Sequence, residues 1–425
     1  MAISAMKAVA FNGRNKKQKS KCRFDRKVSF GTIQIPHISK QLICECLENC
    51  RISSGRLVRQ FEEKFSALLG VEAAVAVSSG TDADILALAL MHDYGAKVGD
   101  EVIVPALSFV ATGNAVIHAG FKPVFVDVER ETLNIDVRKI EQSINEKTKA
   151  IMPVHLMGKP ADMDSICKLA KKYNLMVVED AAEAHGAFYK GQPAGTIGDL
   201  GAFSLYVAHI ITTGEGGIIA TKSEDHAEIL RSLRSHGRSC TCKQCTLNTV
   251  SGFCAKRFNG PNGQDIRFTF DRIGYSCKMN ELEAAIGLGN LENYQKILNK
   301  RRENLLYVLD HFDQFNPFLS TIAEASHEKI GPHAIPIVIN EEAAFSREEF
   351  TSYLETHGVE TRTLFASMPT QCPGFSHLKH RNGDFPIAEY MGKNGIHIGV
   401  HHELDLEDME YVLSVIKEFL ENHQK

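Results

Sequence analysis

The 425-residue sequence contains no tryptophan, no long apolar run, no internal repeat and no low-complexity segment. A helix that crosses a membrane needs about 20 consecutive apolar residues, so the sequence predicts no membrane partner. The net charge of -4 leaves no excess of basic residues for a nucleic-acid surface. With 44% hydrophobic residues, the composition is that of a globular protein with a large buried core.

The N-terminal region also lacks the apolar core and small-residue cleavage site of a secretion signal, and we expect a cytoplasmic protein. Residues 1–30 are basic and polar, which predicts a flexible extension rather than a binding arm. The remaining length is sufficient for two domains. We expect a large domain over residues 31–285, with a cysteine-rich loop at 238–258, and a smaller domain over residues 286–425.

Short apolar strands alternate with amphipathic helices along most of the chain. Helices of this length between strands imply right-handed βαβ units and a mostly parallel sheet, so the expected fold class is α/β. Ligands of such sheets bind beyond the carboxyl ends of the strands. A long helix over residues 280–311 leads into the smaller domain, in which we expect His401 and His402 to lie in a surface loop. The expected strands are residues 71–77, 101–104, 123–128, 149–154, 175–179, 333–339, 359–365 and 396–398.

Gly80 and Thr81 lie at a junction between an expected strand and an expected helix, in the sequence Ser-Ser-Gly-Thr. Free backbone N–H groups and the helix dipole favour a phosphate at such a junction. The same residues are equally typical of a helix cap without any ligand. On the residues alone, the junction is a candidate phosphate site.

The eleven cysteines are unevenly distributed. In a cytoplasmic chain they are expected to be thiols or metal ligands rather than disulfides. Cys240, Cys242, Cys245 and Cys254 have the spacing C-x-C-x2-C-x8-C, which is enough for a tetrahedral sulfur site. We predict a metal site here, with an iron–sulfur cluster as the first interpretation and zinc as the alternative. A loop of free thiols remains a third interpretation.

Residues 203–217, FSLYVAHIITTGEGG, predict a strand, a tight turn and a return strand. This stretch resembles the signature of the DegT/DnrJ/EryC1/StrS family of pyridoxal-phosphate sugar aminotransferases. In that signature a lysine, which forms a Schiff base with the cofactor, precedes the TTGEGG turn. Here His209 occupies the lysine position, and imidazole cannot form a Schiff base. The resemblance therefore implies a non-covalently held cofactor, with His209 as a proton carrier that titrates near its usual pKa of about 6.5.

The resemblance implies a fold type I enzyme of pyridoxal or pyridoxamine 5′-phosphate. Such an enzyme has a large α/β cofactor domain and a small C-terminal α/β domain, and it forms a homodimer. A phosphate would lie against the Gly80–Thr81 junction, an aromatic side chain against the pyridine ring, and a carboxylate against the pyridine nitrogen. The family positions map onto Gly80, Thr81 and Ser204 for the phosphate, Phe109 for stacking, Asp180 for the ring nitrogen, Glu183 near the ring oxygen, and Ser276 for the phosphate of the neighbouring subunit.

One branch of this family also lacks the lysine, namely the iron–sulfur 3-dehydrases of CDP-4-keto-6-deoxyglucose. Cys240, Cys242 and Cys254 match three cluster ligands of that branch. Its fourth ligand position is Ala182 here, and Cys245 could supply the missing thiolate. The resemblance thus implies a pyridoxamine-phosphate dehydratase for a nucleotide-linked 4-keto sugar, with electrons from a partner reductase.

Three alternatives stay open at this point. The first is a dehydratase without a cluster, in which glutamate regenerates the aminated cofactor. The second is a sugar aminotransferase that lacks the lysine, either naturally or by substitution. The third is a non-catalytic member of the family that binds the cofactor without turnover. Arg362, in the segment GVETRTLF, is a candidate contact to the sugar or its phosphate.

Overall fold

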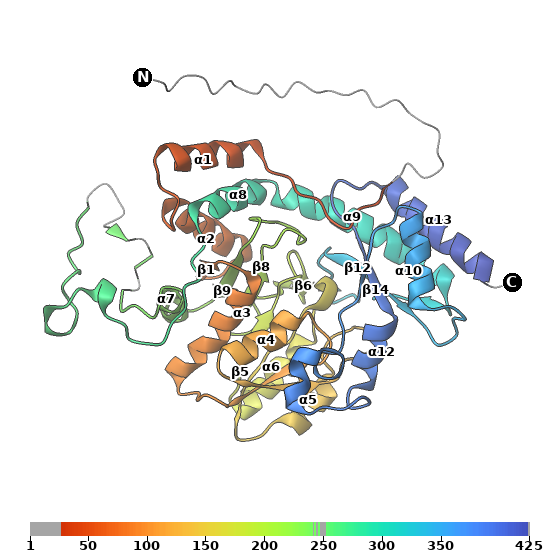
Figure 1. The fold of residues 1–425 in the computed structure, drawn as a ribbon, viewed down its shortest axis with the longest axis horizontal. Coiled ribbons are helices and arrows are strands. Elements are labelled where there is room, and N and C mark those ends of the chain that lie inside the picture. The colour runs from red at the N-terminus through yellow and green to blue at the C-terminus, as the bar shows by residue number, and fades with distance from the viewer. Residues whose placement is uncertain (1–26, 241, 244, 247–251, 424–425) are drawn as a thin grey trace, which may run out of the picture.

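The computed structural model describes residues 27–240, 242–243, 245–246 and 252–423. The basic segment expected at the N-terminus lies almost entirely outside the described residues. Figure 1 shows a large sheet covered by helices and, beside it, a smaller sheet covered by the C-terminal helices. None of the helices in the described part of the chain is long and apolar enough to cross a membrane.

The large sheet has seven strands in the order β1-β9-β8-β5-β4-β2-β3. All pairings from β8 to β3 are parallel, whereas β9 runs antiparallel to both of its neighbours. Most strand positions are buried, as expected for a sheet covered on both faces. The expected α/β fold with a mostly parallel sheet is confirmed. The strands are β1 (Ala73–Val77), β2 (Glu101–Pro105), β3 (Lys122–Val126), β4 (Thr148–Ile151), β5 (Met176–Asp180), β8 (Leu200–Ser204) and β9 (Gly217–Thr221).

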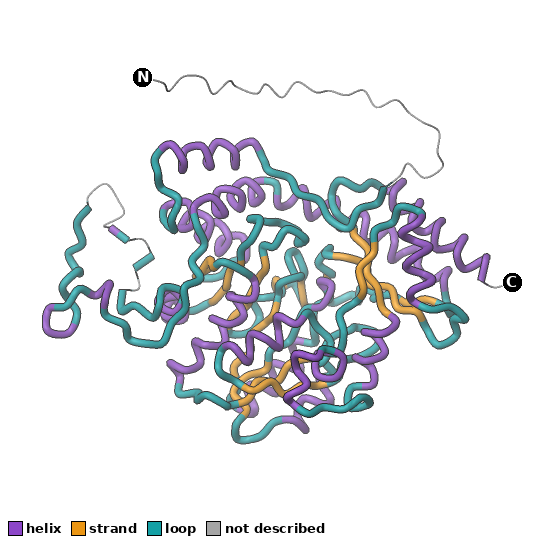
Figure 2. The backbone as a smooth tube through the Cα atoms, in the orientation of Figure 1, coloured by secondary structure: helices purple, strands orange, loops and turns teal. Residues whose placement is uncertain are grey.

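The helices of the large domain lie on both faces of this sheet (Figure 2). The third helix is apolar on nearly all sides because it is covered by the sheet and by its neighbours. Its N-cap is Ser79, whose hydroxyl accepts a hydrogen bond of 3.0 Å from the backbone N–H of Asp82. The helices are α1 (His37–Glu48), α2 (Arg56–Leu69), α3 (Gly80–Ala89), α4 (Val110–His118), α5 (Val137–Ser143), α6 (Met163–Tyr173), α7 (Glu224–Leu233) and α8 (Glu281–Glu292), with short 3₁₀ turns η1 (Leu90–Tyr94) and η2 (Leu156–Gly158).

The smaller domain contains an antiparallel sheet in the order β10-β12-β14-β13. Val28 and Phe30, at the end of the expected extension, are buried against this domain, and Val28 pairs with Val359. A third small sheet has the order β11-β6-β7. The remaining elements are β6 (Phe188–Tyr189), β7 (Gln192–Pro193), β10 (Leu319–Ser320), β11 (Glu328–Lys329), β12 (Ala334–Ile339), β13 (Thr361–Thr363), β14 (Gly395–Gly399), α9 (Tyr294–Phe312), α10 (Arg347–Thr356), α11 (Met368–Gln371), α12 (Pro386–Asn394) and α13 (Leu406–His423).

Two local predictions were wrong. The single helix expected over residues 280–311 is two helices, α8 and α9, which meet at Asn293. The amide side chain of Asn293 donates to the carbonyl of Gly289, and such local bonds compete with a regular helix. His401 is buried rather than at the surface, and its Nε2 lies 3.0 Å from the Ser29 hydroxyl.

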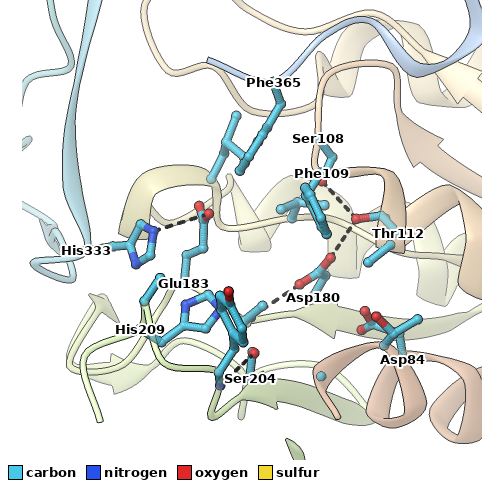
Figure 3. A pocket seen from close by; sticks show the side chains of 18 of the residues that line it. Asp84, Ser108, Phe109, Thr112, Asp180, Glu183, Ser204, His209, His333 and Phe365 are labelled. Atoms are coloured by element: carbon cyan, nitrogen blue, oxygen red, sulfur yellow. Dashed lines mark hydrogen bonds and ion pairs between the residues drawn. The ribbon is translucent and has the colours of Figure 1, made fainter. Parts of the chain in front are cut away.

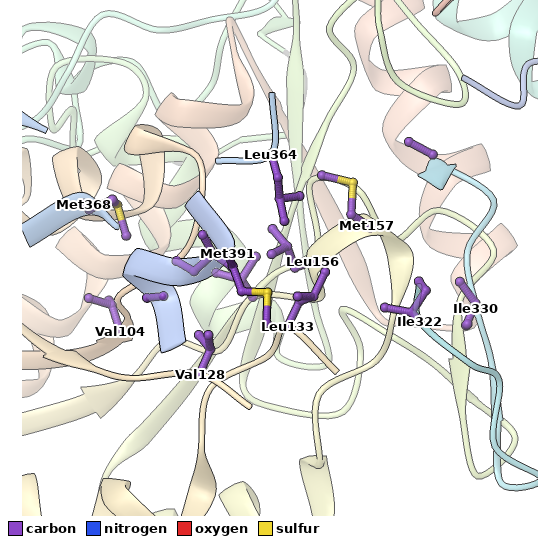
Figure 4. Close-up of a cluster of buried hydrophobic side chains, with 14 of the residues drawn as sticks. Val104, Val128, Leu133, Leu156, Met157, Ile322, Ile330, Leu364, Met368 and Met391 are labelled. Carbon is purple, nitrogen blue, oxygen red and sulfur yellow. The ribbon is translucent and has the colours of Figure 1, made fainter. Parts of the chain in front are cut away.

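One continuous core joins the two domains (Figure 4). Val104 and Val128 of the large domain belong to the same cluster of buried side chains as Leu364 and Met391 of the small domain. Fully burying an apolar side chain of this size contributes about 1.5–3 kcal/mol. The small domain is therefore held against the edge of the large sheet, where the strand ends lie.

The start of α2 depends on a carboxylate from another helix. Gly55 at the N-cap has no side chain that could cap the helix. The buried Glu281 instead accepts hydrogen bonds from the N–H groups of Gly55, Leu57 and Val58 at 2.9 to 3.0 Å. Such charge-assisted bonds are stronger than neutral ones.

We expect Glu281→Ala to lower the free energy of unfolding by about 2–4 kcal/mol, because three N–H groups lose their acceptor. Urea denaturation measures the change. The control is Glu292→Ala, which removes an exposed ion pair of 4.0 Å with Lys64 and should change stability by less than about 1 kcal/mol. Equal effects of the two substitutions would contradict the capping role of Glu281.

Candidate active site

A cavity of about 710 Å³ lies between the two domains. Its floor is formed by residues that follow the carboxyl ends of β1, β2, β4, β5 and β8, and its other wall by residues of β13 and β14. This is the position that the parallel sheet predicts for a ligand. Figure 3 shows the side chains that point into it.

The junction between β1 and α3 has room for an anion. Gly80 and Thr81 are the first residues of α3, whose initial N–H groups have no acceptor within the helix. A Cβ atom at Gly80 would lie 2.7 Å from the Cβ of Ser204, and one at Gly217 would lie 2.1 Å from the carbonyl oxygen of Ser79. The two glycines therefore allow β9 and the end of β8 to approach the helix start closely, and they place the Ser204 hydroxyl beside it.

Asp180, at the end of β5, is buried at the base of the pocket. Its carboxylate accepts a 2.7 Å hydrogen bond from Thr112, whose hydroxyl also lies 2.8 Å from that of Ser108. Burial raises the pKa of Asp180, and the bond from Thr112 opposes this rise. Phe109 at the start of α4 is 56% exposed and points into the same space (Figure 3).

His209 lies in the turn between β8 and β9. Its backbone N–H donates a hydrogen bond of 2.9 Å to the carbonyl of Tyr206. The side chain lines the pocket, and its Nδ1 is buried without a hydrogen-bond partner among the described residues. Burial lowers the pKa of His209 to about 3, and the nearby His185 and Arg301 add to this effect. The usual value of about 6.5 therefore does not apply to His209, because partial burial of the ring lowers its pKa and favours the neutral imidazole.

Glu183, on the loop after β5, is a second buried carboxyl group in the pocket. It accepts a 2.7 Å hydrogen bond from the N–H of Met157, and its other oxygen lies 3.4 Å from Nε2 of His333. Burial raises the pKa of Glu183 to about 8. Burial likewise lowers the pKa of His333, whose ring centre is 5.1 Å from that of His209 (Figure 3).

The structure adds pocket residues that the sequence analysis missed. Asp84 of α3 is buried, its Oδ1 has no partner among the described residues, and burial together with the charge of Asp180 raises its pKa well above the usual range. A lone carboxyl group inside the apolar run Asp-Ile-Leu-Ala-Leu could have revealed it. His333 and His397 had no such signal, because each is an isolated histidine whose position depends on how the two domains meet. Arg362 lines the pocket as expected, with its guanidinium 3.9 Å above the Phe30 ring.

Ser276 and the four cysteines are not pocket residues. Ser276 is exposed and pairs through its backbone with Ser235, so its predicted contact to a neighbouring subunit stays a prediction. The cysteines lie on the segment after α7, which projects away from the sheets (Figure 1).

The described residues of the cysteine-rich segment do not form a preformed metal site. Burial raises the pKa of the Cys240 thiol, and the neighbouring Cys242 and Cys254 add to the rise, so these three lie near one another. Cys245 and Cys254 lie near the Arg267 guanidinium. Within the described residues, however, no group of three or more His, Cys, Asp or Glu side chains is arranged to hold a metal ion.

The pocket fits a pyridoxal-type cofactor. Gly80, Thr81 and Ser204 can hold the phosphate, Asp180 can face the pyridine nitrogen, and Phe109 presents an aromatic face. Among the described residues around the cavity there is no lysine, and His209 stands where a Schiff-base lysine would be expected. A cofactor bound here would be held without a covalent bond.

Comparison with known proteins gives consistent results. Residues 35–417 match the DegT/DnrJ/EryC1/StrS aminotransferase family. The lipopolysaccharide biosynthesis protein RfbH of Salmonella typhimurium is 36% identical over 392 residues, 89% of this chain and 88% of that protein. The GDP-perosamine synthase of Caulobacter vibrioides is 34% identical over 399 residues, 93% of this chain and 98% of that protein. The solved structure of the E. coli GDP-4-keto-6-deoxy-D-mannose-3-dehydratase with bound hydrated PLP has a TM-score of 0.81 and 29% identity, covering 92% of this chain and 99% of the other. With the family signature, the fold and the pocket in agreement, this chain belongs to the DegT/DnrJ/EryC1/StrS aminotransferase family and has the type I fold of pyridoxal-phosphate enzymes.

Proposed function

We propose that this protein is a pyridoxamine 5′-phosphate-dependent dehydratase that removes the C3 hydroxyl group of a nucleotide-linked 4-keto sugar. Its relatives are sugar dehydratases and aminotransferases, which supports an enzyme of sugar metabolism. The observation that favours a dehydratase over an aminotransferase is His209. An aminotransferase of this fold uses a lysine amine to hold and release the cofactor, whereas the pocket presents an imidazole at that position.

The residues of the pocket are suited to this reaction. When bound, the cofactor supplies an amine that condenses with the sugar ketone and a ring that accepts electrons from the bond being broken. Asp180 holds a proton on the ring nitrogen, which strengthens that electron withdrawal. His209, whose pKa is about 3, is unprotonated at neutral pH and can take up a proton at a ring nitrogen.

Substrate recognition is assigned to the wall formed by the small domain. Arg362 faces the pocket and is held over the ring of Phe30. A guanidinium is a strong donor to phosphate oxygens and to sugar hydroxyl groups. We infer that Arg362 contacts the sugar or its diphosphate, and that Ser276 approaches the cofactor phosphate of a second copy in a homodimer.

A sugar aminotransferase is the second candidate, because the GDP-perosamine synthase relative is 34% identical over 93% of this chain. Transamination at this site would require another amine to hold and release the cofactor in place of the missing lysine. Formation of an amino sugar from glutamate and a keto sugar would favour it. Tight cofactor binding without turnover of any keto sugar would instead indicate a non-catalytic member of the family.

We expect the full-length protein with pyridoxamine 5′-phosphate to convert at least one of the GDP-, CDP- and dTDP-linked 4-keto-6-deoxy sugars to its 3-deoxy-4-keto product, with one pyridoxal 5′-phosphate and one ammonia formed per sugar. His209→Asn should lower this rate by about 10²–10⁴-fold, the usual contribution of a general base. It should also abolish exchange of the cofactor methylene hydrogens with D₂O, measured by NMR. Exchange that continues in His209→Asn would contradict the assigned role.

Two further variants serve as controls for this experiment. His311→Gln alters an exposed histidine of α9 and should leave dehydration unchanged. His209→Lys places an amine at the position of the family lysine and should trap pyridoxal phosphate as a borohydride-reducible adduct. The wild-type protein should form no adduct at this position.

After each turnover, the enzyme needs either electrons from a reductase or a new amine from glutamate. We propose that Cys240, Cys242, Cys245 and Cys254 come together on an iron–sulfur cluster, with zinc as the alternative, and that a reductase then supplies electrons. The proximity of Cys240, Cys242 and Cys254 supports a site that forms when metal binds. Ala182 in the pocket, where the iron–sulfur branch has a cysteine, supports the glutamate-recycled alternative.

Protein purified without oxygen should contain iron with matching acid-labile sulfide, measured by elemental analysis and a sulfide assay. Cys240→Ser and Cys254→Ser should lose the metal, because each removes a thiolate ligand. Cys167→Ser, in α6, should retain it. Zinc without sulfide would indicate a structural site, and protein free of both metals would contradict the proposal and leave the glutamate-recycled cycle.

A further inference from the structure

Three ionisable side chains from separate parts of the chain meet in one wall of the pocket. Glu183 follows β5, His209 lies between β8 and β9, and His333 precedes β12. Nε2 of His333 is 3.4 Å from the Glu183 carboxyl group, and the rings of His333 and His209 are tilted by 36° with centres 5.1 Å apart. The Nδ1 atoms of both histidines are buried and have no hydrogen-bond partner within the described part of the chain. His333 thus approaches the Glu183 carboxyl group with Nε2 and lies beside the other imidazole.

The position of His333 is fixed by bonds within the small domain and by one bond to the large domain. The buried guanidinium of Arg301 donates to the carbonyl groups of Pro332 and His333, each at 2.8 Å. The N–H of Gly331 donates to the carbonyl of Gly158 at 2.8 Å, beside the N–H of Met157 that donates to Glu183. The η2 turn, which bonds Glu183, is therefore joined to the segment before β12, which carries His333. This backbone contact holds the two side chains next to each other.

Glu183 and His209 prefer opposite protonation states. Burial raises the pKa of the carboxyl group to about 8 and lowers the pKa of the imidazole to about 3. At neutral pH one is therefore a neutral acid and the other a neutral base, and two groups with pKa values moved apart in this way are suited to an acid–base pair. The other charged or titratable groups that face them are Asp180 of β5, His185 after β5, Arg301 of α9, Arg362 of β13 and His397 of β14.

We propose that His333 is a proton-transfer residue that connects Glu183, the acid of the dehydration, with His209, the base. This assignment rests on the proposed dehydratase function. It divides between two residues the proton uptake and the proton delivery that a single histidine would otherwise have to perform.

The proton transfers balance over one turnover. His209 takes up the proton of the C–H bond that breaks. The C3 hydroxyl group leaves with the electron pair of its C–O bond, receives a proton from Nδ1 of His333, and departs as water. Nε2 of His333 is reprotonated by Glu183, which becomes a carboxylate. The proton on His209 then returns through His333 to Glu183, so all three residues end in their starting states. The water that leaves is made of the proton from the cofactor methylene and the C3 hydroxyl group of the sugar.

The decisive experiment compares two reactions of the full-length protein loaded with pyridoxamine 5′-phosphate. Exchange of the cofactor methylene hydrogens with D₂O requires only His209, whereas dehydration of the keto sugar requires all three residues. In His333→Gln and Glu183→Gln we expect dehydration to fall by about 10–10³-fold and exchange to stay within about threefold of wild type. Dehydration at the wild-type rate in both variants would overturn the proposal.

The controls separate this inference from a structural effect and from the proposed function. Cofactor affinity, measured by absorbance titration, should be unchanged in His333→Gln, the variant whose residue has no assigned contact to the cofactor. If exchange and dehydration fall equally, His333 only positions His209 or the cofactor, and the proton-transfer role is overturned. A wild-type protein that exchanges the methylene hydrogens but dehydrates no keto sugar would contradict the proposed function. The protonation of Glu183 could then still be tested without any substrate.

The protonation of Glu183 can be measured in the cofactor-free protein. Infrared difference spectroscopy should show the carbonyl band of a protonated carboxyl group at pH 7 that is lost as the pH rises through about 8, where Glu183 titrates, and that is absent in Glu183→Gln. Because the folded state binds this proton more tightly than the unfolded state, Glu183 contributes stability that is present at low pH and is lost as the pH rises from about 4.5 to about 8. The melting temperature of Glu183→Gln should therefore rise relative to wild type over this range. An ionised Glu183 at pH 7 would overturn its assignment as the acid.

Discussion

Exclusion of water between the two domains is the constraint on which the chemistry of this protein depends. The shared core that holds the small domain against the strand ends also removes His333, Asp84, Glu183 and the Nδ1 atom of His209 from solvent. Burial disfavours the charged form of each group, so the carboxyl groups keep their protons and the imidazoles lose theirs. A pocket lined by many ionisable residues is therefore close to neutral before anything binds, and any charge that forms during a reaction is stabilised only by the few groups aimed at it.

The close contact between the domains requires particular backbone positions. Gly158 has a left-handed conformation with φ of 79°, and a Cβ atom there would lie 2.0 Å from the carbonyl oxygen of Gly331. No other residue could occupy this position without moving one loop away from the other. That movement would separate Glu183 from His333, since each is held by one of the two loops. The protonation chemistry of the pocket thus depends on a backbone contact that takes no part in it.

The sequence predicted the features that local patterns determine. The alternating strands and helices, and the strand ends that carry Gly80, Phe109, Asp180 and Ser204, follow from periodicity and from the family motifs, and the structure brings these residues to one cavity. The position of His333 could not be predicted, because it depends on how a loop of the small domain meets a loop of the large one. The pKa of His209 was misjudged for a related reason, since a ring in a turn is expected in water until the second domain covers it. The buried His401 shows the same limit.

The replacement of lysine by His209 changes what the rest of the pocket must do. Without a covalent bond, retention of the cofactor depends on the N-terminus of α3, on Ser204 and on the contact with Asp180, each of which contributes a few kcal/mol at most. Such a cofactor can leave and return in either its aldehyde or its amine form. In return, the position beside the reacting bond is occupied by a group that is neutral at pH 7 and is not consumed in holding the cofactor. A lysine there would be both the tether and the base, whereas in this pocket holding and proton transfer belong to different residues. In the proposed dehydratase, this separation leaves the residue beside the reacting bond available for proton transfer.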